Sequence, residues 1–87
     1  MNYISRKTLK ENQVLKVTQG SIVSYYEILE ILSSRITVKL LKACFENSVL
    51  NNFHGSSYFW IGIEYPNQSF SVLDMDVVQF KLMHLND

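Results

Sequence analysis

The chain has 87 residues, the length of a single domain, and 47% of them are hydrophobic and 13% aromatic. Eight basic and eight acidic residues give a formal net charge of zero, which argues against capture of nucleic acid or of an anionic membrane by bulk charge. Charged residues make up only 18% of the chain, so we expect part of its surface to be apolar and to be covered by a protein partner or by a second copy in a homo-oligomer.

Cys44 is the single cysteine, so an intramolecular disulfide cannot form and reducing surroundings are expected. No apolar segment follows the first charged residues, and no stretch approaches the roughly 18 apolar residues of a membrane span. These features predict a cytoplasmic protein that does not bind a membrane.

The first residues of the chain are polar and basic. Arg6, Lys7 and Lys10 stand there against Glu11. Thr8 is placed to cap a short helical turn, with Glu11 reaching back from three residues further on. We predict that residues 1–11 form a polar N-terminal arm and that residues 12–87 form a single globular domain.

A short β-prone run then ends at Gln19-Gly20. In the next apolar stretch, residues 22–32, the spacing of the apolar residues is compatible with a strand and with a helix. Read as a strand, it places apolar side chains on both faces. Read as a helix, it opens with a capping box from Ser24 to Glu27 and carries an apolar stripe. Its Ile, Val and Tyr content favours the strand, and residues 36–42 alternate as a second strand after the short polar connection Ser33-Ser34-Arg35.

The second half of the chain is predicted as a long loop followed by short strands. Residues 46–57 are rich in Asn, Ser and Gly, and the apolar Phe53 within them either packs into the core or meets a partner. Strands are expected at 58–65 and 69–73. A single helical or 3₁₀ turn capped by Asp74 is expected at 74–78, and a closing strand at 79–83.

The predicted strand order resembles that of the small SH3-like or Tudor-like barrel over residues 12–84. The shared features are five or six strands, a long hairpin near the start and a 3₁₀-like turn before the last strand. The resemblance implies an all-β barrel. The alternative is an α+β domain with a helix at about 22–33 packed on an antiparallel sheet.

Reactive side chains do not form a recognisable catalytic or metal-binding pattern. Cys44, His54 and His84 are scattered, whereas a zinc site needs about four closely spaced ligands and a Cys/His nucleophile needs an orienting partner. We therefore predict no enzyme activity, no cofactor and no metal.

The aromatic residues are the best functional lead. Because Tyr58, Phe59 and Trp60 are consecutive on one predicted strand, at least one ring must point outward. An outward ring beside a basic residue can anchor a protein interface or stack a nucleic-acid base. The candidate basic neighbours are Arg35, Lys39 and Lys42.

We predict a non-enzymatic binding or assembly module that contacts a protein through an aromatic patch. The expected binding residues are Tyr25, Lys39, Lys42, Phe53, Tyr58 and Trp60. One alternative is a nucleic-acid-binding barrel that uses the basic arm with Lys39 and Lys42. Another is a structural subunit that associates with itself.

Overall fold

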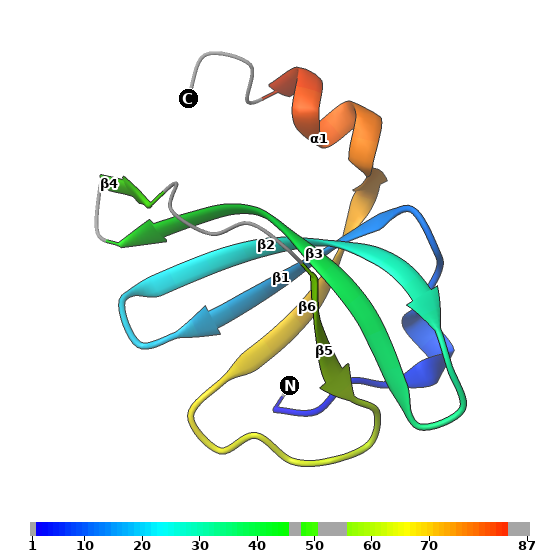
Figure 1. Cartoon of the computed structure of the whole chain (residues 1–87). Helices are drawn as coiled ribbons and strands as arrows, with labels where there is room; N and C mark the ends of the chain where they lie inside the picture. The colour runs from blue at the N-terminus through cyan, green and yellow to red at the C-terminus, as the bar shows by residue number, and fades with distance from the viewer. Residues whose placement is uncertain (1, 46–47, 51–55, 84–87) are drawn as a thin grey trace.

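The computed structural model of the chain describes residues 2–45, 48–50 and 56–83. Within these ranges the protein is mostly β, with one short helix near the end (Figure 1). The elements are η1 (Arg6–Thr8), β1 (Gln13–Gln19), β2 (Ile22–Ile31), β3 (Arg35–Phe45), β4 (Ser48–Leu50), β5 (Ser56–Trp60), β6 (Ser69–Asp76) and α1 (Val77–Met83). No helix in these ranges is long and apolar enough to cross a membrane.

The strands form one antiparallel sheet in the order β4-β3-β2-β1-β6, and β5 pairs with β3 as well. β4 and β5 share one edge of β3, because β5 pairs with residues 35–39 and β4 with residues 43–45. Beyond β5, Ile61 forms a parallel bridge with Ile4. The sheet remains open, since β6 ends the order and pairs with β1 among the described strands.

The predicted hairpin of two long strands is confirmed, and the alternative helix at 22–33 is wrong. β2 and β3 pair along most of their length, and the backbone N–H of Leu32 donates to the carbonyl of Arg35 at 2.8 Å across the turn. Most of β2 is half-buried on both faces rather than alternating. One face of β2 meets the main core and the other meets α1. Apolar residues are therefore needed on both faces, which explains why the sequence pattern was compatible with a strand and with a helix.

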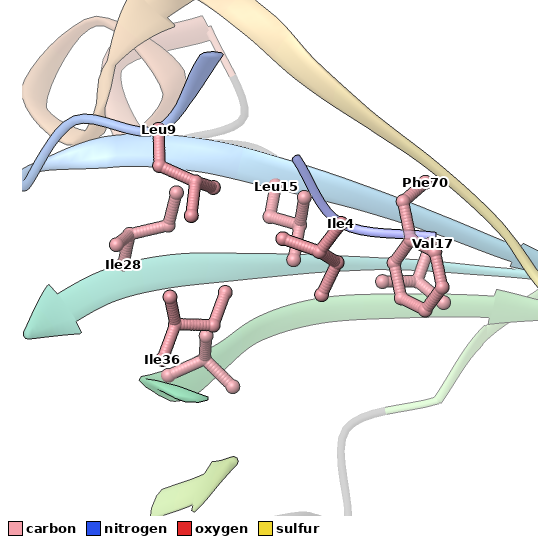
Figure 2. Close-up of a cluster of buried hydrophobic side chains, with 8 residues drawn as sticks. Ile4, Leu9, Leu15, Val17, Ile28, Ile36 and Phe70 are labelled. Atoms are coloured by element: carbon pink, nitrogen blue, oxygen red, sulfur yellow. The ribbon is translucent and has the colours of Figure 1, made fainter. Parts of the chain in front are cut away.

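The main core lies on one face of the sheet, which we call the inner face. Eight buried side chains form it: Ile4, Leu9, Leu15, Val17, Ile28, Ile36, Val38 and Phe70 (Figure 2). Two of them, Ile4 and Leu9, come from the segment expected to be a polar arm. This segment therefore packs on the core through Ile4 and Leu9, although most of its residues are polar or charged.

Thr8 does not cap a helical turn as expected. It ends η1, and its hydroxyl donates to the carbonyl of Ser5 at 3.1 Å. The turn begins three residues earlier in the chain than the Thr8–Glu11 spacing indicated, because η1 follows Ser5 and not Thr8. Its position lets Ile4 and Leu9, on either side of the turn, both reach the core.

The C-terminal part differs most from the prediction. The strand β6 continues through Asp74 to Asp76, and the expected closing strand at 79–83 is instead the helix α1. The carboxylate of Asp76 accepts the backbone N–H of Gln79 at 2.8 Å, and the side-chain oxygen of Gln79 accepts the N–H of Asp76 at 3.2 Å. Asp76 and Gln79 thus form a reciprocal capping box, so the cap is Asp76 and not Asp74.

α1 covers part of the outer face of the sheet. Val77 and Phe80 form a second buried cluster with Val14 of β1, and the Phe80 ring lies 5.0 Å from the ring of Tyr25. The spacing of Val77 and Phe80 places both on one side of the helix. Burial on this side outweighs the β preference of the Val77-Val78 pair.

The predicted loop at 46–57 and the predicted strand at 58–65 are both corrected in part. Residues 48–50 and 56–57 belong to β4 and β5, while residues 46–47 and 51–55 lie outside the described residues. β5 ends at Trp60, shortly before Gly62, whose φ of 78° interrupts an extended strand. The strand expected at 69–73 is confirmed within β6.

Candidate binding surface

The register between β3 and β5 decides which side chains share the outer face. Arg35 lies opposite Trp60, Thr37 opposite Tyr58, and Lys39 opposite Ser56. Residues directly opposite each other on antiparallel strands point to the same side of the sheet. The intervening Ile36 and Val38 are buried in the main core, so Arg35, Thr37 and Lys39 point to the outer face with their partners.

Two rings and a guanidinium meet on this outer face. The rings of Tyr58 and Trp60 make a T-shaped contact with centroids 5.4 Å apart and planes at 84°. The guanidinium carbon of Arg35 lies 5.3 Å from the centroid of the Tyr58 ring, within the range of a cation–π contact. We call Arg35, Tyr58 and Trp60 the aromatic patch.

The aromatic patch is open to solvent. Tyr58 is 50% exposed and Trp60 is 38% exposed. Leaving two large rings in water forgoes the free energy that their burial would contribute, about 25 cal/mol per Å² of apolar surface. The patch can therefore release that free energy only when another surface covers it.

The rigid support behind the aromatic patch comes from Tyr65, an aromatic residue that is not among the predicted binding residues. Its hydroxyl oxygen accepts the backbone N–H of Trp60 at 2.9 Å. Its ring also packs edge-on against Phe59 and Phe70, with centroids 6.2 and 5.2 Å away. The last residue of β5 is in this way fixed to the main core.

A shallow hollow adjoins the aromatic patch at the β2–β3 turn. It is lined by Leu32, Ser33, Ser34, Arg35 and Trp60. Arg6 fixes the β2–β3 turn, because its guanidinium donates to the carbonyl oxygens of Leu32 and Ser33. The backbone N–H of Ile61 also donates to the carbonyl of Ser34 at 2.9 Å. The hollow thus has fixed walls beside an exposed ring.

Charges of both signs lie beside the aromatic patch on β2 and β3. Lys39 lies opposite Glu27 on the neighbouring strand β2, and Glu30 lies opposite Thr37. Opposite charges on facing residues partly neutralise each other. The outer face is therefore aromatic at the rings and of mixed charge at the rim formed by β2 and β3.

The other predicted binding residues lie elsewhere. Tyr25 is half-buried against Phe80, beneath α1. Lys42 lies opposite Tyr25, near a register shift in the β2–β3 pairing. Phe53 lies outside the described residues. The structure therefore brings Tyr58 and Trp60 together with Arg35, one of the candidate basic neighbours, and places Lys39 on the same face. Tyr25 and Lys42 belong to a different region.

Metal-ligating side chains do not cluster in the part of the chain that the structure describes: no group of three or more His, Cys, Asp or Glu is placed to hold an ion. Cys44 is half-buried and unpaired with another cysteine. Comparison with protein-family models, with curated proteins and with solved structures gives no match for this chain.

Proposed function

We propose that this chain is a non-enzymatic binding module whose aromatic patch contacts a protein partner. The observation that carries the proposal is the exposed T-shaped pair of Tyr58 and Trp60 with Arg35 over the Tyr58 ring. Tyr, Trp and Arg are the residue types most enriched where protein interfaces concentrate their binding free energy. A rim of mixed charge around an apolar centre is also typical of such interfaces.

The charge arrangement favours a protein over a nucleic acid. A phosphate backbone is bound by cations that lack competing carboxylates, and its binding scales with the number of phosphates neutralised. Here Lys39 faces Glu27, and Glu30 lies on the same face as Arg35. A protein partner can present both charge signs to this rim, whereas a phosphate backbone would meet repulsion from both carboxylates.

The same proposal extends to the fold and its location. We propose that the curved sheet is a small SH3-like barrel left open between β6 and the N-terminal segment. A reducing compartment such as the cytoplasm suits its unpaired Cys44.

Ligand selection with matched variants tests the protein-binding proposal. Displayed random peptides are selected on the immobilised full chain, and the dissociation constants of the enriched peptides are measured by interferometry. Replacing a ring at the centre of an interface costs about 2 kcal/mol or more, so Tyr58→Ala is expected to weaken binding by about thirtyfold. Val78→Ala is the control, because Val78 is also an exposed residue with a largely apolar side chain but lies on α1.

Tyr58→Ala and Val78→Ala are both expected to fold as the parent does, because both side chains are exposed. The proposal fails if the selected ligands tolerate both Tyr58→Ala and Trp60→Ala without loss of affinity.

Self-association is a second candidate, and a separate observation favours it. One side of α1 packs on the sheet through Val77 and Phe80, whereas Val78, Leu82 and Met83 are all exposed. Val78 and Leu82 are four residues apart and share one side of the helix, so a second copy of the chain can cover them together.

A further inference from the structure

A second apolar site lies on the inner side of the molecule, at the opening of the sheet. A groove of about 320 Å³ runs between the N-terminal segment and the strand β6. Its lining residues are Tyr3, Ile4, Ser5, Thr8, Leu9, Leu15, Phe70, Ser71 and Val72. In Figure 2, Leu15 of β1 lies between Leu9 and Ile4 of the N-terminal segment, and Phe70 of β6 lies beside Ile4.

The groove marks a place where two parts of the fold, the N-terminal segment and β6, face each other without pairing; we call it the seam. On one side, the N-terminal segment is fixed to the end of β5, because Ile4 bridges Ile61 and its carbonyl accepts the N–H of Gly62 at 2.9 Å. The other side is β6, which pairs with β1 alone among the described strands. The curved sheet thus brings its β6 edge opposite the segment bound to β5 without pairing the two.

The free edge of β6 offers backbone hydrogen bonds to an occupant. In an edge strand, alternate N–H and C=O groups point away from the sheet, and they accept another extended strand readily. Within the described residues, no backbone hydrogen bond occupies this edge from Ser69 to Met75, while the N–H of Asp76 donates to the side chain of Gln79. The edge therefore provides direction and spacing that suit an extended polypeptide.

The side chains along β6 match the same occupant. Phe70 and Val72 point into the core beside the groove, with Ser71 between them on the opposite face. A strand added beside β6 has the same two-residue period, so its apolar residues would enter the groove and its polar residues would face outward. No lysine, arginine or carboxylate lines the groove, so the entering side chains are expected to be uncharged.

We propose that this groove binds one extended segment of another protein, apolar at alternate positions, which adds to the free edge of β6. The segment closes the seam between β6 and the N-terminal segment. Because the groove is bounded on both sides, its occupant must be a single strand with two free edges. The edge strand of a folded sheet, such as β6 of a second copy, is attached to the rest of its sheet and core. It therefore does not fit between the N-terminal segment and β6.

The test uses the full chain and a library of displayed random decapeptides. Enriched peptides are expected to alternate apolar and polar residues. Thr8→Phe places a ring on the groove wall and is expected to weaken their binding by about tenfold or more. The neighbouring Lys7 is also exposed but does not line the groove, so Lys7→Phe is the matched control and is expected to change affinity by less than about twofold.

Amide hydrogen exchange on the unmodified chain gives a second, independent readout. In the complex, alternate amides between Ser69 and Asp76 should become protected, while the fluorescence of Trp60 stays unchanged. Peptides that shift Trp60 emission belong to the aromatic patch, so each proposal can fail without the other.

Three results would overturn the proposal. The first is a failure to enrich alternating peptides. The second is peptide binding that neither protects β6 amides nor responds to Thr8→Phe. The third is an apolar dye that occupies the groove while no peptide does, which would identify a small-molecule site.

Discussion

At the scale of single residues, burial separates side chains that hold the fold from side chains left for contact. Ile28 is fully enclosed in the main core at 0% exposure, whereas Ile63 is 51% exposed beyond β5. Ile28→Val removes a methylene from a packed interior and is expected to lower the free energy of unfolding by about 0.5–1.5 kcal/mol. Urea denaturation followed by circular dichroism measures the change.

Ile63→Val is the matched control, because the chemical change is the same and only the surroundings differ. We expect it to alter the free energy of unfolding by less than about 0.5 kcal/mol. Equal destabilisation by the two variants would contradict the assignment of the core.

The contacts of the aromatic patch show what the residues alone could not reveal. The sequence indicated that at least one ring of the Tyr58-Phe59-Trp60 run points outward and named Arg35 as one possible neighbour. Which ring meets which cation depends on the pairing of β5 with β3, two strands separated by residues 46–55. The same holds for Ile4 and Leu9, whose partners in the core lie on strands further along the chain.

At the scale of elements, local preference predicted the strands well and the helix poorly. The β-branched and aromatic content of β2 and β3 agrees with their structure, so the hairpin followed from composition. In α1, Val77 and Val78 disfavour a helix, and the helix depends on packing against Val14 and Tyr25. A local signal was nevertheless present in the spacing of Asp76 and Gln79, which is that of a capping box.

The capping box makes a direct prediction for α1. Asp76→Ala leaves the N–H of Gln79 without its acceptor and is expected to lower the free energy of unfolding by about 0.5–2 kcal/mol. Asp76→Asn keeps a cap of similar strength and should come close to the parent. Both values follow from urea denaturation.

Asp74→Ala serves as a control within the same strand, because Asp74 is an exposed residue of β6 with no capping role. If Asp74→Ala destabilises the chain more than Asp76→Ala, the helix does not begin where the structure places it.

At the scale of the whole molecule, apolar surface is exposed in separate places. The aromatic patch lies over β3 and β5, and the exposed side of α1 lies at the C-terminal end of β6 (Figure 1). With only 18% charged residues, the chain has little charge with which to keep such surfaces apart in solution. Association of copies through α1 is therefore expected at micromolar concentration.

Sedimentation velocity over a range of concentrations tests this association. Leu82→Ser places a hydroxyl on the exposed side of α1 and should shift the population towards monomer. Leu29→Ser, which changes another exposed leucine on β2, should leave the distribution unaltered. A parent chain that stays monomeric throughout removes self-association as a candidate function.

The most direct measurement for the proposed function uses Trp60, the only tryptophan of the chain, as an internal probe of the aromatic patch. A ligand selected on the full chain is titrated into it while tryptophan emission is recorded, and calorimetry reports binding independently. If the patch is the contact surface, the emission shifts to shorter wavelength and saturates at the stoichiometry found by calorimetry, because the ring leaves water. Heat of binding with unchanged Trp60 emission would contradict it.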